Sequence, residues 1–381
     1  MRLFKQYNKK LIDLSKGNQR QEALSITKRI EKQLFGWVQP KWQTTIELYE
    51  SYKGSGLVIC MGNEQVRYAL VTLEIIRKVF KFELPIEVFY MGDNDLSKEN
   101  QETIKEKISD VKLVDITKLF DMNTITIGGW AIKPFAVLAS SFEKVLMMDS
   151  DVIFLQSPQT LFDSKLFTTK GALFFHDRTL YSQGPSTLNW MYSLMPKPPS
   201  EYSGSLRTFR KQTKHEQESG VVLIDKRERF HGILATCLLN AGGIRRYTYD
   251  RVFGDKETFW LGMEMAQEEY TFNGHYPGNL GVSKKVGGYY QLCCRQILHF
   301  DENDSPIWYN GGMQEMKRIE DSPLIKVEDY WEETGSWELF EKNMACLKAK
   351  QPPLRFNPEF KSVISQSEQI AIELGMRHQS K

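Results

Sequence analysis

The stretch KVLMMDSDVIFL, residues 144–155, decides the fold that we expect for this chain. Its first half is a short, mostly apolar run that ends abruptly in Asp149, Ser150 and Asp151, and four apolar residues follow. A short apolar run predicts a buried strand, and open α/β sheets bind ligands at the carboxyl ends of such strands. Two buried like charges are costly unless a cation offsets them. The stretch therefore predicts a central strand followed by a ligand-binding turn, after which the strand resumes at 152–155.

Asp149 and Asp151 are the residues that this pattern marks as metal ligands. Mg²⁺ and Mn²⁺ prefer oxygen ligands and often bridge one or two carboxylates to the phosphates of a substrate. Two aspartates that flank one residue can place both carboxylates near a single ion. The alternative is an ordinary acidic turn between two strands.

The residues before this stretch predict the rest of the sheet. Apolar runs at 57–61, 86–90 and 111–114 read as strands. Helical patterns lie between them, at 68–79 and from Ser97 onward, and another covers 131–142. Alternating strands and helices predict an α/β fold with a mostly parallel, Rossmann-like sheet.

Four segments carry further candidate site residues, each with a structural alternative. Glu218 opens a strand at 218–225, and Asp255 and Glu257 either bind sugar hydroxyls or begin a helix. His299 lies in an apolar run, where a histidine is either a core residue or a metal ligand. Trp130 is one of several scattered aromatic residues that either pack in the core or stack on a base or sugar face.

Composition excludes several classes of protein. The 381 residues carry a net charge of +2, from 50 basic and 48 acidic side chains, without the basic excess of a nucleic-acid binder. The hydrophobic content of 41% excludes disorder for most of the chain. Five cysteines do not form a disulfide scaffold, although one pair can form in an oxidising compartment. No apolar stretch approaches the roughly 20 residues that span a bilayer, and residues 1–21 do not resemble a signal peptide, so we expect a soluble chain as written.

In this order, the segments resemble the fungal α-mannosyltransferases of glycosyltransferase family 71, the α-1,3-mannosyltransferase type. The resemblance covers residues from about 34 to 313. The matching segments are 84–90, 132–142, Asp149–Asp151, 171–178, 218–225, 254–262, 277–278 and 308–312.

The resemblance implies a GT-A fold and a GDP-mannose donor. It further implies a retaining transfer, dependent on Mn²⁺ (or Mg²⁺), to a mannosylated glycan or glycoprotein. Asp149 and Asp151 would form the metal and donor motif, with Lys133 and Trp130 on the donor. By looser analogy with glycogenin-like enzymes, His299 would be a third metal ligand, and Glu218, Asp255 and Glu257 would be the catalytic candidates. Retention requires either a covalent intermediate on a carboxylate or attack from the face of the leaving group, and both remain open.

The resemblance also bears on domains and location. We expect a helical amino-terminal segment at 1–53, a GT-A catalytic domain at 54–320 and a helical tail at 321–381. Enzymes of this type are normally anchored in the Golgi with their catalytic domains in the lumen, and this chain shows no such anchor. Two other functions stay open: a UDP-hexose transferase of the glycogenin-like class, and a non-catalytic descendant that binds sugar nucleotides or glycans.

Overall fold

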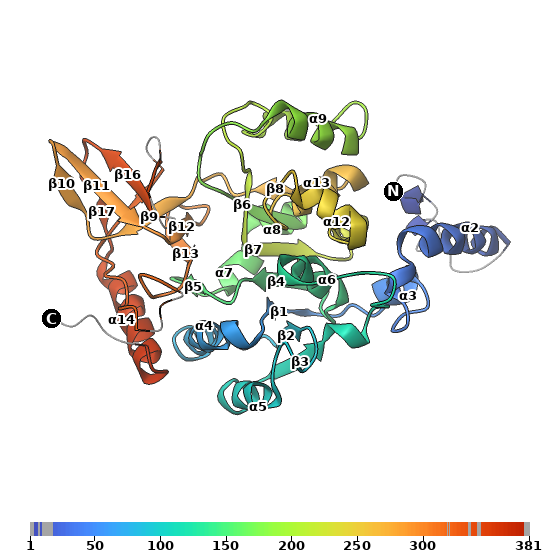
Figure 1. Ribbon diagram of the computed structural model, residues 1–381, viewed down its shortest axis with the longest axis horizontal. Coiled ribbons are helices and arrows are strands. Elements are labelled where there is room, and N and C mark those ends of the chain that lie inside the picture. Colours follow the sequence, from blue (N-terminus) through green and yellow to red (C-terminus); the bar gives the residue numbers. More distant parts are fainter. Residues whose placement is uncertain are drawn as a thin grey trace.

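The computed structural model describes residues 4–6, 8–9, 18–317, 319, 321–333, 337–340 and 344–376. Its core is a seven-stranded sheet with helices on both faces, and two smaller sheets follow at one end (Figure 1).

The central sheet has the strand order β3-β2-β1-β4-β7-β6-β8. Strands β1 to β4 run parallel, whereas β7 runs antiparallel to both of its neighbours, β4 and β6. Its strands are β1 (Ser55–Cys60), β2 (Ile86–Tyr90), β3 (Val111–Asp115), β4 (Lys144–Met148), β6 (Ala172–His176), β7 (Gln217–Asp225) and β8 (Thr271–Phe272). This topology confirms the predicted fold class, a GT-A-type α/β fold with a Rossmann-like mixed sheet.

Helices bury both faces of this sheet, which explains why its strands read as continuous apolar runs. Within β1, Val58 faces the core on the side of α6 and α11, and Leu57 and Ile59 face the core on the side of α4. The helices are α4 (Val66–Lys78), α5 (Lys98–Lys107), α6 (Ile132–Ala139), α7 (Gln159–Asp163), α8 (Lys165–Lys170), α9 (Pro185–Leu194), α10 (Glu201–Ser205), α11 (Phe230–Leu239), α12 (Gly242–Tyr249) and α13 (Thr258–Ala266). Short 3₁₀ turns are η2 (Asn63–Gln65), η3 (Ile116–Lys118) and η4 (Gly129–Ala131).

The strand that resumes after Asp151 leaves the central sheet. This strand, β5 (Val152–Phe154), pairs with β13 at the edge of a six-stranded sheet of order β17-β14-β9-β12-β13-β5. The other members are β9 (Gly278–Gly281), β12 (Ile297–Phe300), β13 (Pro306–Asn310), β14 (Asp329–Glu332) and β17 (Leu354–Arg355). The turn at Asp149–Asp151 therefore marks the point where the chain passes from one sheet to the other.

The amino-terminal segment is mostly helical in the part that is described, and it packs on the central domain. It contains α2 (Asn18–Leu34), η1 (Gly36–Val38) and α3 (Thr45–Glu50), at the right of Figure 1. Phe35 and Trp37 follow α2, and the Trp37 ring packs edge-on against Phe120 and Phe135. Residues 1–3, 7 and 10–17 of the predicted helical segment lie outside the described residues.

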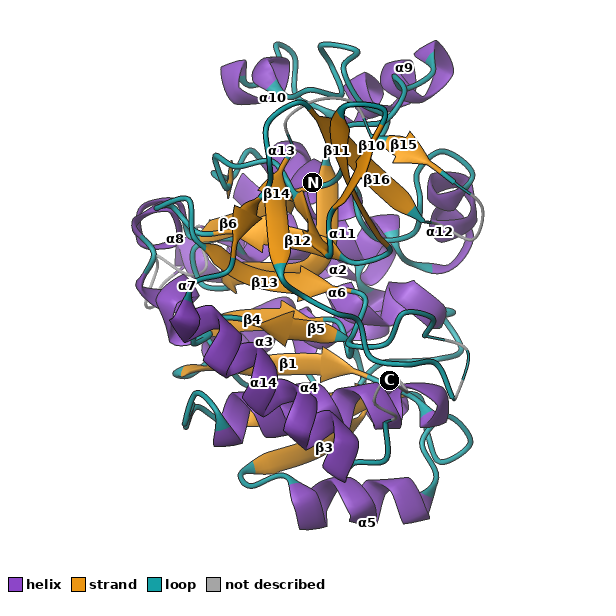
Figure 2. Ribbon diagram, turned by 90° about the vertical axis from the view of Figure 1, so that its left-hand side faces the viewer, coloured by secondary structure: helices purple, strands orange, loops and turns teal. Residues whose placement is uncertain are grey.

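The carboxyl-terminal segment differs from the predicted helical tail. Only its second half, α14 (Pro358–Glu373), is helical among the residues described after 320, and Figure 2 shows α14 in front of α4. Before it, β14 and β17 complete the six-stranded sheet, and β15 (Glu338–Leu339) and β16 (Ala345–Ala349) form a four-stranded sheet with β10 (Lys284–Val286) and β11 (Tyr289–Cys294). A disulfide between Cys293 and Cys346 joins β11 to β16. In the described part of the chain, we find no helix with the length and apolar character needed to span a membrane.

Candidate active site

The candidate site forms where several chain segments meet at one edge of the central sheet. Asp149 follows the end of β4, and Asp177 follows the end of β6. Glu218 lies at the start of β7, which runs the other way and therefore begins at the same edge. The Asp149 amide donates to the Gly220 carbonyl at 2.8 Å, which fixes the first turn against β7.

One charged group at this edge centres on Lys133, in the first turn of α6. Its ammonium lies 2.9 Å from Asp149 Oδ1 and 3.1 Å from Asp255 Oδ2, and it also donates to the Ser219 hydroxyl. Burial alone would lower the pKa of Lys133, but the two carboxylates outweigh it and hold that pKa above its usual value. Burial raises the pKa of Asp255, and the shared ammonium offsets only part of this effect. The structure thus brings together three predicted residues, Lys133, Asp149 and Asp255.

A second charged group centres on Lys256, the residue after Asp255. Its ammonium lies 2.8 Å from Asp177 Oδ2 and 2.7 Å from Glu218 Oε2. Burial favours the protonated acids, but the ammonium between them reverses this effect and lowers the pKa of both carboxyl groups. For the same reason the pKa of Lys256 is raised. Two buried acids therefore stay ionised beside the predicted metal site.

Two further hydrogen bonds hold the Glu218 carboxylate in place. Glu218 Oε1 accepts hydrogen bonds from the Gly220 amide and from Asn310 Nδ2, each at 2.9 Å. A Cβ atom on Gly220 would lie 2.8 Å from Asn310 Nδ2, so glycine is needed for this approach. Sequence reasoning gave no role to Asp177, Lys256 or Asn310, although each lies inside a segment that carries the resemblance. The one available signal was Lys256 itself, a lysine between two acids ahead of an apolar helix.

Asp151 differs from Asp149 in burial and in partner. Its side chain is 6% exposed, against 27% for Asp149, and its Oδ2 atom pairs with the ammonium of Lys317. The donor set suits a hard divalent cation, since it offers carboxylate oxygens on both sides of a turn and leaves other positions to phosphate and water. The Lys317 ammonium on a nearly buried carboxylate shows that positive charge is accommodated there.

His299 lies in β12, surrounded by aromatic rings. Its ring stacks on Trp308 at a centroid distance of 3.9 Å, and Phe175 packs on it edge-on. Burial lowers the pKa of His299 to about 3, and its Nε2 atom has no hydrogen-bond partner. Among the described residues, Asp149, Asp151 and His299 do not form a group of ligand atoms within 4.8 Å of one another. The structure thus leaves His299 apart from the two aspartates, and its role as a third metal ligand stays a prediction.

Glu257 is buried, whereas Trp130 is exposed. Glu257 Oε1 accepts from the Glu216 amide and Oε2 from Trp260 Nε1, so this fully buried carboxylate holds the start of α13 in place. Trp130 is 53% exposed, and its ring lies 5.1 Å from that of Phe253. The helix-start alternative therefore fits Glu257, whereas Trp130 presents an aromatic face to solvent three positions before Lys133, the other residue predicted to contact the donor.

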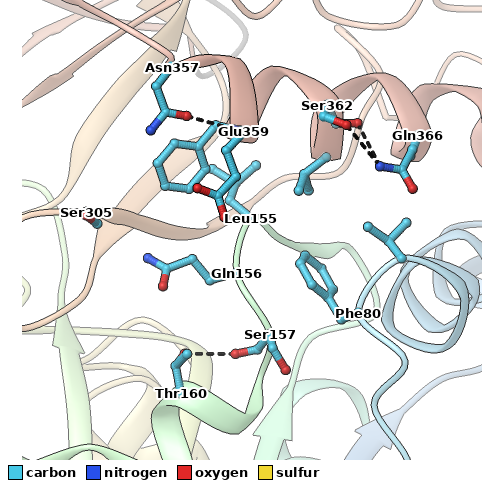
Figure 3. A pocket seen from close by; sticks show the side chains of 13 residues that line it. Phe80, Leu155, Gln156, Ser157, Thr160, Ser305, Asn357, Glu359, Ser362 and Gln366 are labelled. Carbon is cyan, nitrogen blue, oxygen red and sulfur yellow. Dashed lines mark hydrogen bonds between the residues drawn. The ribbon is translucent and has the colours of Figure 1, made fainter.

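Two other features lie outside this site. His275, Asp304 and Glu332 form the one group of three potential metal ligands with atoms within 4.8 Å that the described residues contain. A groove lies between α14, the end of α4 and the segment after β5, and Figure 3 shows Gln156, Glu359 and Gln366 among its lining residues. Neither contains a residue that the sequence marked as a site.

The sequence of this chain is similar to those of known mannosyltransferases. A family model described as "Mannosyltransferase putative" matches residues 54–301. Alpha-1,3-mannosyltransferase MNT3 of Saccharomyces cerevisiae is 29% identical over 304 residues, which cover 70% of this chain and 47% of that protein. Alpha-1,3-mannosyltransferase MNT2 of the same yeast is 25% identical, with 73% and 55% covered. The chain thus spans about half the length of these curated relatives.

Among solved structures, core-mannan synthase A from Aspergillus fumigatus in its Mn/GDP form is 11% identical, with a TM-score of 0.38 and with 62% of this chain and 75% of that chain covered.

Proposed function

The chain belongs to this mannosyltransferase family, and from that premise we propose that it transfers mannose from GDP-mannose to a hydroxyl group of a mannosylated glycan or glycoprotein. We further propose that the reaction is retaining, forms an α-1,3 linkage and depends on Mn²⁺ or Mg²⁺ bound by Asp149 and Asp151. The observation that carries this proposal is the pair of aspartates at the carboxyl end of β4, with Lys133 2.9 Å from Asp149. That edge is where open α/β sheets bind nucleotides.

The first task of such a site is to stabilise the departing GDP. A bound divalent cation would offset the negative charge of the diphosphate. Lys133 is buried, and its raised pKa keeps it charged, so it adds a fixed positive charge beside Asp149. Trp130, exposed in η4 just before α6, offers a face on which the guanine base or a sugar can stack.

The second task is to stabilise positive charge on the mannose ring as its bond to GDP breaks. Glu218 and Asp177 remain ionised because Lys256 lowers the pKa of both carboxyl groups. Both carboxylate oxygens of Glu218 accept hydrogen bonds, Oε1 from Gly220 and Asn310 and Oε2 from Lys256. A carboxylate engaged in this way is a weak nucleophile, which favours an electrostatic role for Glu218 and attack of the acceptor from the face of the leaving group.

The disulfide supports a location in the secretory pathway. Disulfides persist in oxidising compartments and are uncommon in the reducing cytosol. Cys293–Cys346 therefore agrees with the Golgi lumen that we propose for the chain.

The test is a donor panel with a matched pair of variants. Wild type, Asp151→Asn and Asp163→Asn are each incubated with Mn²⁺, an α-mannobiose acceptor and GDP-mannose, UDP-glucose or UDP-galactose, and products are identified by mass spectrometry. Asp163 is an exposed acid at the end of α7 and controls for the loss of one negative charge. We expect mannose transfer from GDP-mannose by wild type and Asp163→Asn, and a loss of at least about 100-fold in Asp151→Asn, in line with the loss of a main electrostatic group.

Each other outcome points to one of the alternative functions. Transfer from a UDP-sugar would replace the donor and support a glycogenin-like hexosyltransferase. Binding of sugar nucleotides without any transfer would support a non-catalytic binding protein. Full activity of Asp151→Asn at saturating Mn²⁺ would remove the metal assignment.

A further inference from the structure

Lys317 forms an ion pair with the more buried of the two predicted metal ligands. Its side chain is 41% exposed and reaches from the surface to Asp151 Oδ2, on a carboxylate that is 6% exposed. Nothing in the sequence marked this lysine, which lies 166 positions after Asp151 (317 minus 151) and beyond the segments that carry the resemblance.

The segment that carries Lys317, residues 311–317, is fixed to the Asp149–Asp151 turn by its backbone. The Gly312 amide donates to the Asp151 carbonyl at 2.8 Å, and Gly311 and Gly312 adopt φ values of +116° and +70° that favour glycine. At the other end of the segment, the Tyr68 hydroxyl of α4 donates to the Lys317 carbonyl. The backbone of Lys317 is therefore anchored beside the turn, while its side chain is 41% exposed.

Both aspartates thus already have a lysine partner in this structure. Lys133 neutralises Asp149, and Lys317 neutralises Asp151. The two lysines differ in exposure, because the Lys133 side chain is 7% exposed and bonded on several sides whereas that of Lys317 is 41% exposed. A divalent cation that binds Asp151 Oδ2 must displace the Lys317 ammonium, because the two positive charges would repel each other at the same carboxylate oxygen.

We propose that Lys317 exchanges partners when the donor binds: its ammonium leaves Asp151 as the divalent cation arrives and pairs with the diphosphate that the cation brings. This inference rests on the proposed function, because it requires a nucleotide diphosphate bound with its metal. Lys317 is then a donor-binding residue. It weakens binding of the metal alone, strengthens binding of the metal and nucleotide together, and so favours their arrival as one complex.

The exchange predicts effects of opposite sign in one variant. Without nucleotide, Lys317→Met should bind Mn²⁺ roughly three- to tenfold more tightly than wild type, because a partly exposed competing ion pair is removed. At saturating Mn²⁺, the same variant should bind GDP at least about tenfold more weakly, because it loses a charge-assisted bond to phosphate. Both affinities are measured by isothermal titration calorimetry on the full chain, and Mn²⁺ binding is checked by electron paramagnetic resonance.

Two controls isolate the role of the ammonium. Lys326→Met removes an exposed lysine further along the same connection and should change neither affinity. Lys317→Arg keeps the charge and should retain most of the GDP affinity. Thermal melting of each variant confirms that it is folded before titration.

The possible results separate this inference from the proposed function. Unchanged or weaker Mn²⁺ binding by Lys317→Met, unchanged GDP binding, or no Mn²⁺ binding by wild type would each overturn the exchange. Opposite shifts without any mannosyl product from wild type would support the exchange and overturn the transferase proposal. Mannosyl product from wild type without these shifts in affinity would support the transferase proposal and overturn the exchange.

Discussion

Lys256 offers the sharpest test of how the site is held together, because one ammonium serves two buried acids. Asp177 and Glu218 lie 2.8 and 2.7 Å from it, and their side chains are 6% and 2% exposed. Lys256→Met keeps most of the volume of the side chain and removes its charge. Removing one partner of a buried ion pair typically costs about 3–5 kcal/mol, because the other charge stays buried without compensation. Lys256 is itself 21% exposed, so we expect a loss at the lower end, about 3 kcal/mol at pH 7.

The pH dependence of this loss has a definite sign. In wild type the folded-state pKa values of Asp177 and Glu218 are lowered, so their stabilising contribution is present above the unfolded-state pKa values and disappears as pH falls through the folded-state values. In Lys256→Met burial dominates and raises both pKa values, so the cost is present at neutral pH. It declines on acidification, because the buried carboxylates take up protons. The gap between wild type and variant should therefore be wide at pH 7 and narrow toward pH 4.

Urea unfolding followed by tryptophan fluorescence, at pH 7 and at pH 5 and 4, measures this gap. Adding Glu218→Gln to Lys256→Met removes one of the unpaired charges and should restore about 1 kcal/mol or more at pH 7. Lys170→Met removes an exposed partner of Glu269 and should cost at most about 1 kcal/mol. A Lys256→Met variant within about 1 kcal/mol of wild type at pH 7, or a gap that does not change with pH, would refute this account of the site.

Two further predictions concern His299 and the disulfide. Burial lowers the pKa of His299 to about 3, whereas a histidine in the unfolded chain has a pKa of about 6.5. Below a pH of about 6.5 the unfolded chain therefore binds a proton that the folded chain does not. The unfolding free energy of wild type should fall by about 2 kcal/mol between pH 7 and 5 from this residue alone. His299→Phe should lack that loss in urea unfolding, and a Mn²⁺ titration equal to that of wild type would rule out His299 as a metal ligand. The Cys293–Cys346 disulfide closes a loop of 53 residues, so Cys346→Ser should lower the unfolding free energy by about 2–4 kcal/mol. Reduction by dithiothreitol should lower the stability of wild type to the same extent. A melting temperature that does not change with reductant would contradict a stabilising role for the disulfide.

The central sheet was predictable from sequence because its signals are local. Strands buried on both faces read as nearly continuous apolar runs, and β1, β2 and β4 show that pattern apart from Ser55, Glu87 and Lys144. The carboxyl-terminal strands were missed for the opposite reason. Strands β15 and β17 have two residues each and are exposed, so no period is visible, and their partners lie elsewhere in the chain. The departure of β5 from the central sheet was also hidden, because its partner β13 lies about 150 residues later.

The candidate site was predictable in its aspartates but not in their partners. Asp149 and Asp151 stand out because charges interrupt an apolar run, and that signal lies within one short stretch. Lys256 shows only the weaker signal of a lysine between two acids, and Lys317 shows none, because their partner acids lie 38 to 166 positions away. Sequence alone shows which residues are costly to bury, whereas only the fold shows which opposite charges make that burial possible.

The distribution of charge explains why this edge of the sheet would receive a nucleotide together with its metal. Asp149, Asp151 and Asp255 face two ammonium groups, and Asp177 and Glu218 face one. Each group, with its acids ionised, thus retains one negative charge (three minus two, and two minus one), and His299 with its lowered pKa adds no positive charge near neutral pH. An anionic diphosphate alone would be repelled by this surplus, whereas a divalent cation matches it and reverses the local sign. Because each of these acids already has a lysine partner, the chain can fold with the site in place, and in the exchange that we propose the arriving cation displaces the Lys317 ammonium, the more exposed of the two that face the aspartates.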